Sequence, residues 1–228
     1  MNDELKFTVI SDTHYYSKKN FVDGFDKNKK PKPGQLFFSR SEEIVEHTFD
    51  CLCKNDTPDI VLISGDLTYN GERTSHDEMK AALKKLQQKG KRVYVITATH
   101  DYTSPRMPTY GIDKNDKYIE VESVKRTQLL KYYGDFGYNN AIAKHKSTMS
   151  YVAQLADGYR LFALNDDYGD PDCGFSDELM NWVKTEANNA KRDGQYIIAM
   201  THHPLVPPSP IYAAVAKGDM LSEYELRR

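Results

Sequence analysis

The stretch Phe7-Thr-Val-Ile-Ser-Asp12-Thr-His14 joins an apolar, β-branched run directly to a carboxylate and an imidazole. Because strand side chains repeat every two residues, a buried strand that ends in Asp-x-His directs both polar side chains to the same place. A carboxylate oxygen and an imidazole nitrogen are common ligands of divalent transition metals. The stretch therefore predicts a strand that ends in a pair of metal ligands.

The same arrangement, an apolar run that ends in polar side chains, occurs three more times. Residues 60–66 end in Asp66, residues 93–101 end in His100 and Asp101, and residues 196–203 end in His202 and His203. Four strand ends that each deliver possible ligands favour one shared site over four unrelated turns.

The composition limits the class of protein. A chain of 228 residues suits a single α/β domain and is long enough to bury a core. Its 31 Lys and Arg nearly balance its 33 Asp and Glu, so the total charge favours neither nucleic acid nor an anionic membrane as partner. No apolar run approaches the ~20 residues that span a bilayer. The first residues lack the apolar stretch of a signal peptide.

The three cysteines cannot all form disulfides with one another. Cys51 and Cys53 lie two residues apart on a predicted helix and so on different faces, which is typical of reduced thiols. We therefore expect a soluble, cytoplasmic protein.

The first half of the chain alternates strands and helices. A helix is predicted from Ser39 or Ser41, as the N-terminal cap, to about Asn55, and another from Ser75 to Gln88, between the first three strands. This order predicts parallel strands joined by right-handed crossovers. Ligands gather at the carboxyl ends of such strands, where the polar clusters lie.

Two long segments that follow strand ends are rich in residues typical of loops. Residues 15–38 leave the Asp12–His14 end and are rich in turn formers, so they form either a wall of the site or a solvated insertion. Residues 102–118 are predicted to be a long loop, and residues 122–133 a helix.

The second half predicts a mixed sheet. Residues 149–155 and 159–164 are strand-like and flank Asp157-Gly158, a hairpin signal. Ser176 is predicted to cap a helix that ends near Arg192, and residues 196–200 form the last clear strand. From residue 219 a helix-like pattern begins and stops at residue 228.

Taken together, the polar clusters resemble those of the calcineurin-like metallophosphoesterases. The pattern of that family is Asp-x-His, Gly-Asp, Gly-Asn-His-Asp/Glu, a later His and Gly-His-x-His, each at a strand end around a two-metal site. The resemblance covers nearly the whole chain, and the first four elements are matched by Asp12-Thr13-His14, Gly65-Asp66, Ala98-Thr99-His100-Asp101 and His202.

The resemblance implies an α/β fold, an αββα sandwich of mixed β-sheets flanked by helices. Because the chain stops before a Gly-His-x-His motif, we expect a single domain over residues 1–228 that lacks the family's C-terminal strands.

The resemblance also implies two divalent metal ions, of which Mn, Fe and Zn all suit these ligands. By carry-over, Asp12, His14 and Asp66 hold one ion, and Asp66, His202 and Thr99 hold the other. Thr99 stands where the family has Asn, and its shorter hydroxyl is a poorer ligand than an amide carbonyl.

Two residues are expected to act in catalysis. His100 resembles the family's non-ligand histidine, which contacts the phosphate and protonates the leaving group. Asp101 is expected to fix the tautomer of His100 and to raise its pKa. His203 is expected either to contact phosphate or to support the ligands.

The function implied is a metal-dependent phosphohydrolase that cleaves a small-molecule phosphodiester or phosphomonoester by a metal-activated hydroxide. The alternative is a degenerate module that binds a phosphate ligand or a protein partner without turnover. A third interpretation, a fragment of a longer enzyme, accommodates both. The sequence indicates neither the substrate nor the oligomeric state.

Several other polar residues are expected to have no role in the site. His47 and His76 are predicted to be solvated beside helices, His145 to lie in a polar loop, and residues 18–32 to form a solvated, charged loop. The sixteen tyrosines are expected at structural positions and not on a base-stacking surface.

Overall fold

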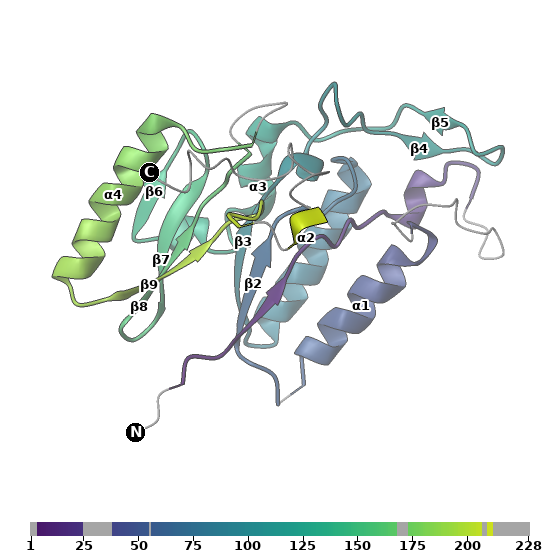
Figure 1. The fold of residues 1–228 in the computed structure, drawn as a ribbon. Coiled ribbons are helices and arrows are strands. Elements are labelled where there is room, and N and C mark those ends of the chain that lie inside the picture. The colour runs from purple at the N-terminus through teal and green to yellow at the C-terminus, as the bar shows by residue number, and fades with distance from the viewer. Residues whose placement is uncertain (1–3, 25–37, 55, 168–172, 207–208, 212–228) are drawn as a thin grey trace.

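The computed structural model describes residues 4–24, 38–54, 56–167, 173–206 and 209–211, and these residues form layers of helix, sheet, sheet and helix (Figure 1). The first sheet is parallel, with the order β1-β2-β3, as the alternation of strands and helices predicted. Its strands and their crossover helices are β1 (Phe7–Ile10), α1 (Ser41–Leu52), β2 (Ile60–Ser64), α2 (Arg73–Gln88) and β3 (Arg92–Ile96).

The second sheet is mixed, which confirms the prediction made from the second half of the chain. Its order is β6-β7-β8-β9, with antiparallel pairing up to β8 and a parallel β8–β9 pair. The predicted cap of the following helix is present, because the Ser176 hydroxyl accepts a hydrogen bond from the backbone N of Leu179 (3.1 Å). The elements are β6 (Ala143–His145), β7 (Ser150–Ala156), β8 (Tyr159–Ala163), α4 (Asp177–Arg192) and β9 (Tyr196–Met200).

Strand β2 shows why the layers form. All of its side chains are buried, and alternate residues face opposite sides because the strand repeat is two residues. Val61 and Ile63 pack with the helices α1 and α2, whereas Ile60 and Leu62 pack against the second sheet. A third cluster joins the other face of the second sheet to α4. The expected αββα sandwich is therefore confirmed.

The segment between β3 and β6 differs from the prediction. The helix expected over residues 122–133 is only α3 (Leu129–Tyr133), which follows the 3₁₀ turn η4 (Arg126–Gln128). Residues 122–124 are extended instead, because the Glu122 carbonyl and the Val124 amide hydrogen-bond to the start of α2 and the preceding loop. The loop expected over residues 102–118 contains the first strand of a small hairpin, β4 (Gly111–Ile112). Its antiparallel partner, β5 (Tyr118–Ile119), begins at the end of that range. Shorter turns are η1 (Lys18–Asn20), η2 (Phe38–Arg40), η3 (Thr99–Asp101) and η5 (Tyr138–Asn140).

Residues 15–21 are largely packed against the body of the protein, whereas residues 22–24 are exposed, so the solvated-insertion interpretation is wrong for residues 15–21. Tyr16 and Ser17 are fully buried, and the backbone N of Tyr16 donates to the hydroxyl of Ser41 (3.0 Å). That hydroxyl therefore serves Tyr16 and does not cap α1. Residues 25–37, and the helix-like pattern from residue 219, lie outside the described residues.

Two histidines, His76 and His145, are buried, which differs from what was expected of each. The side chain of His76 lies inside the protein, with Nδ1 2.6 Å from the Tyr133 hydroxyl and Nε2 3.0 Å from the backbone O of Asp101. His145 lies in β6 with Nδ1 2.9 Å from the Thr148 hydroxyl. The prediction that His76 is solvated is wrong because tertiary packing covers it, and His145 occupies a buried strand position in place of the expected polar loop. His47 is exposed, as predicted.

The three cysteines are free thiols, as expected. Within the described residues, no helix has the length and apolar character that crossing a membrane requires.

Candidate metal centre

The centre lies at the carboxyl ends of β1, β2, β3 and β9, where the sequence analysis expected it (Figure 1). The chain continues in register past the ends of β1 and β2. The backbone N of Asp12 donates to the O of Gly65 (3.2 Å), and that of His14 to the O of Asp66 (3.0 Å). These bonds hold the Asp-x-His loop beside the Gly-Asp loop.

The ligand-bearing loops depart from ordinary backbone geometry. Asp12, His14 and Asp66 have φ angles of +55°, +40° and +52°, in the left-handed region that non-glycine residues rarely adopt. Each such residue costs about 1–3 kcal/mol, which the surrounding structure must offset. Asp116 and Met149 also have positive φ, but three such residues gathered at one place are typical of a functional site.

Gly65 allows the loops to approach one another. A Cβ atom at this position would lie 2.7 Å from the Cβ of Ala98 and 3.0 Å from Nδ1 of His202. The φ of Gly65 is also +98°. The absence of a side chain therefore lets the ends of β2, β3 and β9 meet.

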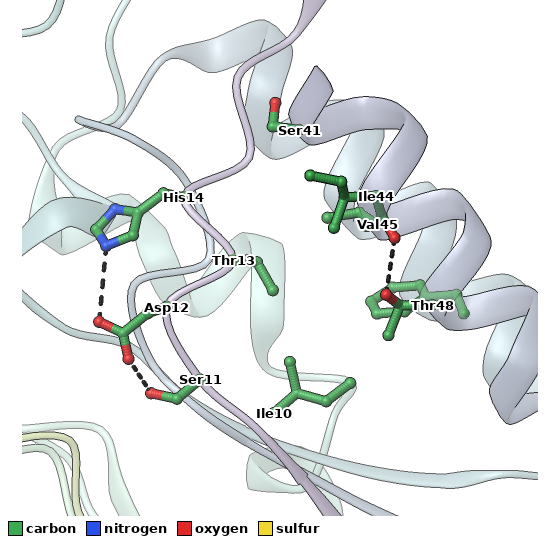
Figure 2. A pocket seen from close by; sticks show the side chains of 10 residues that line it. Ile10, Ser11, Asp12, Thr13, His14, Ser41, Ile44, Val45 and Thr48 are labelled. Atoms are coloured by element: carbon green, nitrogen blue, oxygen red, sulfur yellow. Dashed lines mark hydrogen bonds and ion pairs between the residues drawn. The ribbon is translucent and has the colours of Figure 1, made fainter. Parts of the chain in front are cut away.

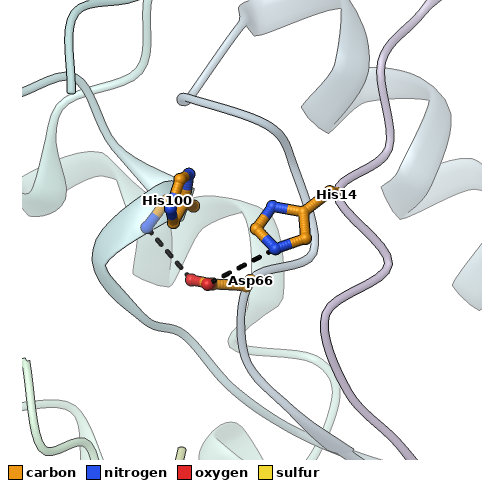
Figure 3. Close-up of side chains that lie close together, drawn as sticks. All are labelled: His14, Asp66 and His100. Carbon is orange, nitrogen blue, oxygen red and sulfur yellow. Dashed lines mark hydrogen bonds and ion pairs between the residues drawn. The ribbon is translucent and has the colours of Figure 1, made fainter. Parts of the chain in front are cut away.

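All of the expected ligand residues except Thr99 lie in two overlapping clusters, which also include His100. Asp12, Asp66 and His202 form one, and His14, Asp66 and His100 form the other, with the ligand atoms of each cluster within 4.8 Å of one another. Figure 3 shows that the side chains of the second cluster converge. Oδ2 of Asp66 lies 3.3 Å from Nε2 of His202 and 3.8 Å from Nε2 of His14. Asp66 is thus the residue that both clusters share.

The clusters differ from the expected grouping in one respect. The family resemblance groups Asp12 with His14, and these side chains do lie close, with 3.6 Å between Oδ1 and Nε2. In the structure, however, His202 approaches the same carboxylates, and His100 joins His14 and Asp66.

The neighbouring histidines lower the pKa values of the two carboxyl groups at the centre. Burial of Asp66 raises its pKa, but its hydrogen bond with His202 and the nearby histidine charges outweigh burial and lower it. For Asp12 the same balance, with hydrogen bonds to His14 and Ser11, lowers the pKa to about 2. Both carboxyls are therefore ionised at neutral pH.

This set of donors fits divalent transition metal ions. Among the described residues, Asp12 and Asp66 form ion pairs with histidines and with no Lys or Arg. Burial lowers the pKa of His202, but the Asp66 carboxylate raises it to about 10. Anionic oxygens and imidazole nitrogens that share one buried place are the ligands that Mn, Fe and Zn prefer.

Asp166 supports the histidine end of the centre and was missed by the sequence analysis. Its Oδ2 accepts hydrogen bonds from the backbone N of His202 (3.1 Å) and of His203 (2.8 Å). Its Oδ1 lies 3.0 Å from Nδ1 of His203. The sequence feature that could have indicated Asp166 is the polar run Asn165-Asp166-Asp167, which follows β8 after Leu164. Strand β8 pairs with β9, so this run lies near the end of β9.

His203 and His202 have different surroundings. His203 is buried and is held by Asp166, which favours the supporting role of the two that were expected. Nδ1 of His202 lies 2.8 Å from the backbone O of Ser64. Because that carbonyl can only accept, Nδ1 carries a proton, and Nε2 is the nitrogen that would bind a metal once its own proton is displaced.

Asp101 does not orient His100, and this expectation is wrong. The Asp101 carboxylate is fully buried and accepts from the backbone N of Thr68 (2.9 Å) and of Ala98 (2.9 Å). Burial, followed by the charge of Asp66, raises the pKa of Asp101 to about 7. Its side chain ties the loop after β2 to the loop after β3.

The pKa of His100 is lowered and not raised, chiefly because burial disfavours the imidazolium. The backbone N of His100 donates to Oδ1 of Asp66 (3.0 Å), which fixes the start of η3 against the centre. Thr99, half-buried, directly precedes this anchored amide. Its role as a ligand stays a prediction.

A cavity of about 300 Å³ lies between residues 10–14 and α1, and Asp12 and His14 are among the residues that line it. In Figure 2, Asp12 and His14 extend from one side of the backbone, whereas Ile44, Val45 and Thr48 of α1 lie on the other. The cavity therefore borders the loop that carries Asp12 and His14.

Comparisons with known proteins agree with this geometry. The sequence profile of the calcineurin-like phosphoesterases matches residues 5–227. The chain belongs to the calcineurin-like phosphoesterase family. Its fold is similar to the crystal structure of a dimetal phosphatase from Danio rerio, with a TM-score of 0.57 and 12% sequence identity over 88% of this chain and 70% of that one. No match was found among curated proteins.

Proposed function

We propose that this calcineurin-like phosphoesterase hydrolyses a small-molecule phosphodiester or phosphomonoester with two divalent metal ions, Mn, Fe or Zn, in its centre. The observation that supports this most directly is the position of Asp66. Its buried carboxylate belongs to both ligand clusters, and a carboxylate is the side chain that offers two anionic oxygens to two cations. Asp12, His14, His202 and Thr99 would complete the two sites.

The residues of the centre have separate tasks in this proposal. Bound divalent ions supply positive charge to the phosphoryl oxygens and lower the pKa of water. Asp66 holds the two sites together, while the hydrogen bond from His202 to Ser64 keeps Nε2 of His202 available. Family membership supports phosphate esters as the class of substrate.

His100 is the proposed general acid. Its Nδ1 is engaged by backbone and side-chain oxygens, so in the imidazolium form the proton on Nε2 would pass to the leaving-group oxygen as the P–O bond breaks, leaving the neutral Nδ1–H imidazole. The ring of His100 lies edge-on to that of His14, with 4.7 Å between the centroids, and so stands beside the ligands.

The proposal is tested by assaying purified protein with Mn²⁺ and with both bis(p-nitrophenyl) phosphate and p-nitrophenyl phosphate. We expect turnover of at least one ester and its loss in Asp66→Asn. The control variant is Asp50→Asn, which makes the same chemical change on the exposed face of α1. Equal activity in wild type and Asp66→Asn would contradict the proposal.

The second candidate function is a module that binds phosphate without turnover. The observation that favours it is Thr99, a hydroxyl where the family's pattern has an amide ligand. Metal-loaded protein that binds inorganic phosphate but releases no p-nitrophenol from either ester would support this candidate.

A further inference from the structure

The imidazole of His100 is held through Nδ1 by the loop that follows β2. Nδ1 lies 2.5 Å from the backbone O of Tyr69 and 2.9 Å from Oδ1 of Asn70. Both partners belong to the segment Gly65-Asp-Leu-Thr-Tyr-Asn70-Gly, which also supplies Asp66. The loop that carries the shared ligand therefore also holds the proposed general acid.

The hydrogen-bond partners at Nδ1 determine the tautomer of His100. The Tyr69 carbonyl can only accept, so Nδ1 of His100 must carry a proton. The Asn70 atom that faces this N–H must then be the amide oxygen. The other amide atom, Nδ2, faces the backbone O of Pro108 (3.4 Å), which also requires an N–H donor. The orientation of the Asn70 amide is thus specified from both ends.

Asn70 itself is rigidly placed. It is 5% exposed, and its backbone N donates to both carboxylate oxygens of Glu72 (3.1 and 3.2 Å). Its backbone O accepts a hydrogen bond from the Thr109 hydroxyl. The next residue, Gly71, has a φ of +75°, and a Cβ there would lie 2.7 Å from the Cα of Tyr102. The loop is therefore packed against the segment that follows η3.

We propose that Asn70 is the positioning residue of His100: beside the Tyr69 carbonyl, its amide oxygen accepts from Nδ1–H and orients the ring so that Nε2 faces the leaving group. This inference rests on the proposed function for its consequence in catalysis. It assigns to Asn70 the task that the sequence analysis gave to Asp101, whose carboxylate is occupied by the amides of Thr68 and Ala98.

Two substitutions separate this task from a merely structural one. Asn70→Leu removes both the acceptor for His100 and the donor for Pro108, at similar side-chain size. Asn70→Asp removes only the donor and keeps an oxygen for Nδ1. Positioning therefore predicts that Asp restores what Leu loses, whereas anchoring of Pro108 predicts that both variants are equally impaired.

The first measurement needs no turnover. Long-range ¹H–¹⁵N spectra of metal-free protein report which ring nitrogen of His100 carries the proton. We expect the Nδ1–H form in all three proteins, because the Tyr69 carbonyl remains, but a second ring orientation in Asn70→Leu that shifts or broadens the His100 signals. The control is Asn140→Leu, at an exposed asparagine, with the wild-type spectrum. Unchanged His100 signals in Asn70→Leu would overturn the proposal.

The second measurement is the dependence of kcat on the leaving group. Asn70→Leu should lower kcat by roughly 10- to 100-fold for an alkyl phosphate ester, within the range of general acid help. The loss should be smaller for p-nitrophenyl esters, because a good leaving group needs little protonation. Equal losses for both esters would overturn the positioning role. If wild type turns over neither ester, the proposed function fails while the spectra still decide the role of Asn70.

Discussion

At the scale of single residues, the centre combines ligands that the motif predicts with one residue that departs from it. Thr99 lies beside His100, whose amide is anchored to Asp66, so its side chain starts from a fixed backbone position. A hydroxyl on this backbone reaches less far than an amide carbonyl. The strength of metal binding at the centre should therefore depend on this position.

Thr99→Asn is expected to tighten the binding of Mn²⁺ by about tenfold, or about 1.4 kcal/mol. The amide carbonyl supplies an oxygen donor that extends further towards the ligands. Isothermal titration of metal-free protein measures the change, and Thr185→Asn, on the exposed face of α4, is the control. An unchanged affinity would mean that position 99 does not contribute a ligand.

Burial of His76 makes the stability of the protein depend on pH. Burial lowers the pKa of His76 from 6.5 to about 3 in the folded protein. Between these values the unfolded chain binds a proton that the folded protein does not. The contribution is fully present above pH 6.5 and is lost as the pH falls, by about 1.4 kcal/mol per pH unit.

His76→Gln should remove this slope. Glutamine keeps a donor for the Asp101 carbonyl and an acceptor for the Tyr133 hydroxyl but does not titrate. Between pH 6.5 and pH 5, urea unfolding should show wild type losing about 2 kcal/mol more than the variant. His47→Gln, at an exposed position of α1, should behave as wild type. Parallel pH curves for wild type and His76→Gln would contradict the expectation.

At the scale of elements, the site depends on close contact between the ends of neighbouring strands. Asp101 joins the loop after β2 to the loop after β3, and Asp166 joins the end of β8 to the end of β9. Gly65 occupies the position where these ends come closest. A side chain at this point would separate the loops that carry the ligands.

Gly65→Ala should therefore destabilise the protein more than the same change at another glycine of positive φ. Gly90 is the matched control, because its φ is +87° and a Cβ there meets no atom within 4 Å. Gly90→Ala should cost only the backbone strain, about 1 kcal/mol. Gly65→Ala adds the contacts with Ala98 and His202, so thermal unfolding should show a loss of about 2–4 kcal/mol together with weaker Mn²⁺ binding. Equal losses would show that the loops can separate without cost.

At the scale of the whole molecule, two sheets pack through one apolar layer that also contains a specific polar contact. Tyr151 of β7 is buried in this layer, and its hydroxyl donates to the backbone O of Val95 in β3 (3.1 Å). A hydroxyl between two sheets fixes how they are aligned, which apolar side chains alone do less strictly.

Tyr151→Phe is expected to lower the free energy of unfolding by about 1–2 kcal/mol, because it leaves a buried carbonyl without this donor. Denaturant unfolding measures the change, and Tyr196→Phe is the control because Tyr196 is 70% exposed on β9. A loss confined to Tyr151→Phe is expected, and a wild-type stability in that variant would contradict the role of the hydroxyl.

Much of the fold and of the centre could be predicted from local patterns. The apolar run before Asp12 and the run before Asp66 each form a parallel strand, and their ligands meet because parallel strands share their carboxyl ends. The helix predicted over residues 122–133 failed for a physical reason. Its first residues hydrogen-bond to the loop before α2, and these tertiary partners outweigh a helical pattern.

The sequence by itself determined which elements form and which chemical groups stand at their ends, because these depend on periodicity and on residue type within a few positions. Only the tertiary structure decided the partner of each group. The Asp101 carboxylate accepts from backbone amides, the Asn70 amide oxygen contacts the imidazole of His100, and Asp166 connects the second sheet to the ligands. Such contacts join segments far apart in the chain and depend on side-chain directions, which no local pattern specifies.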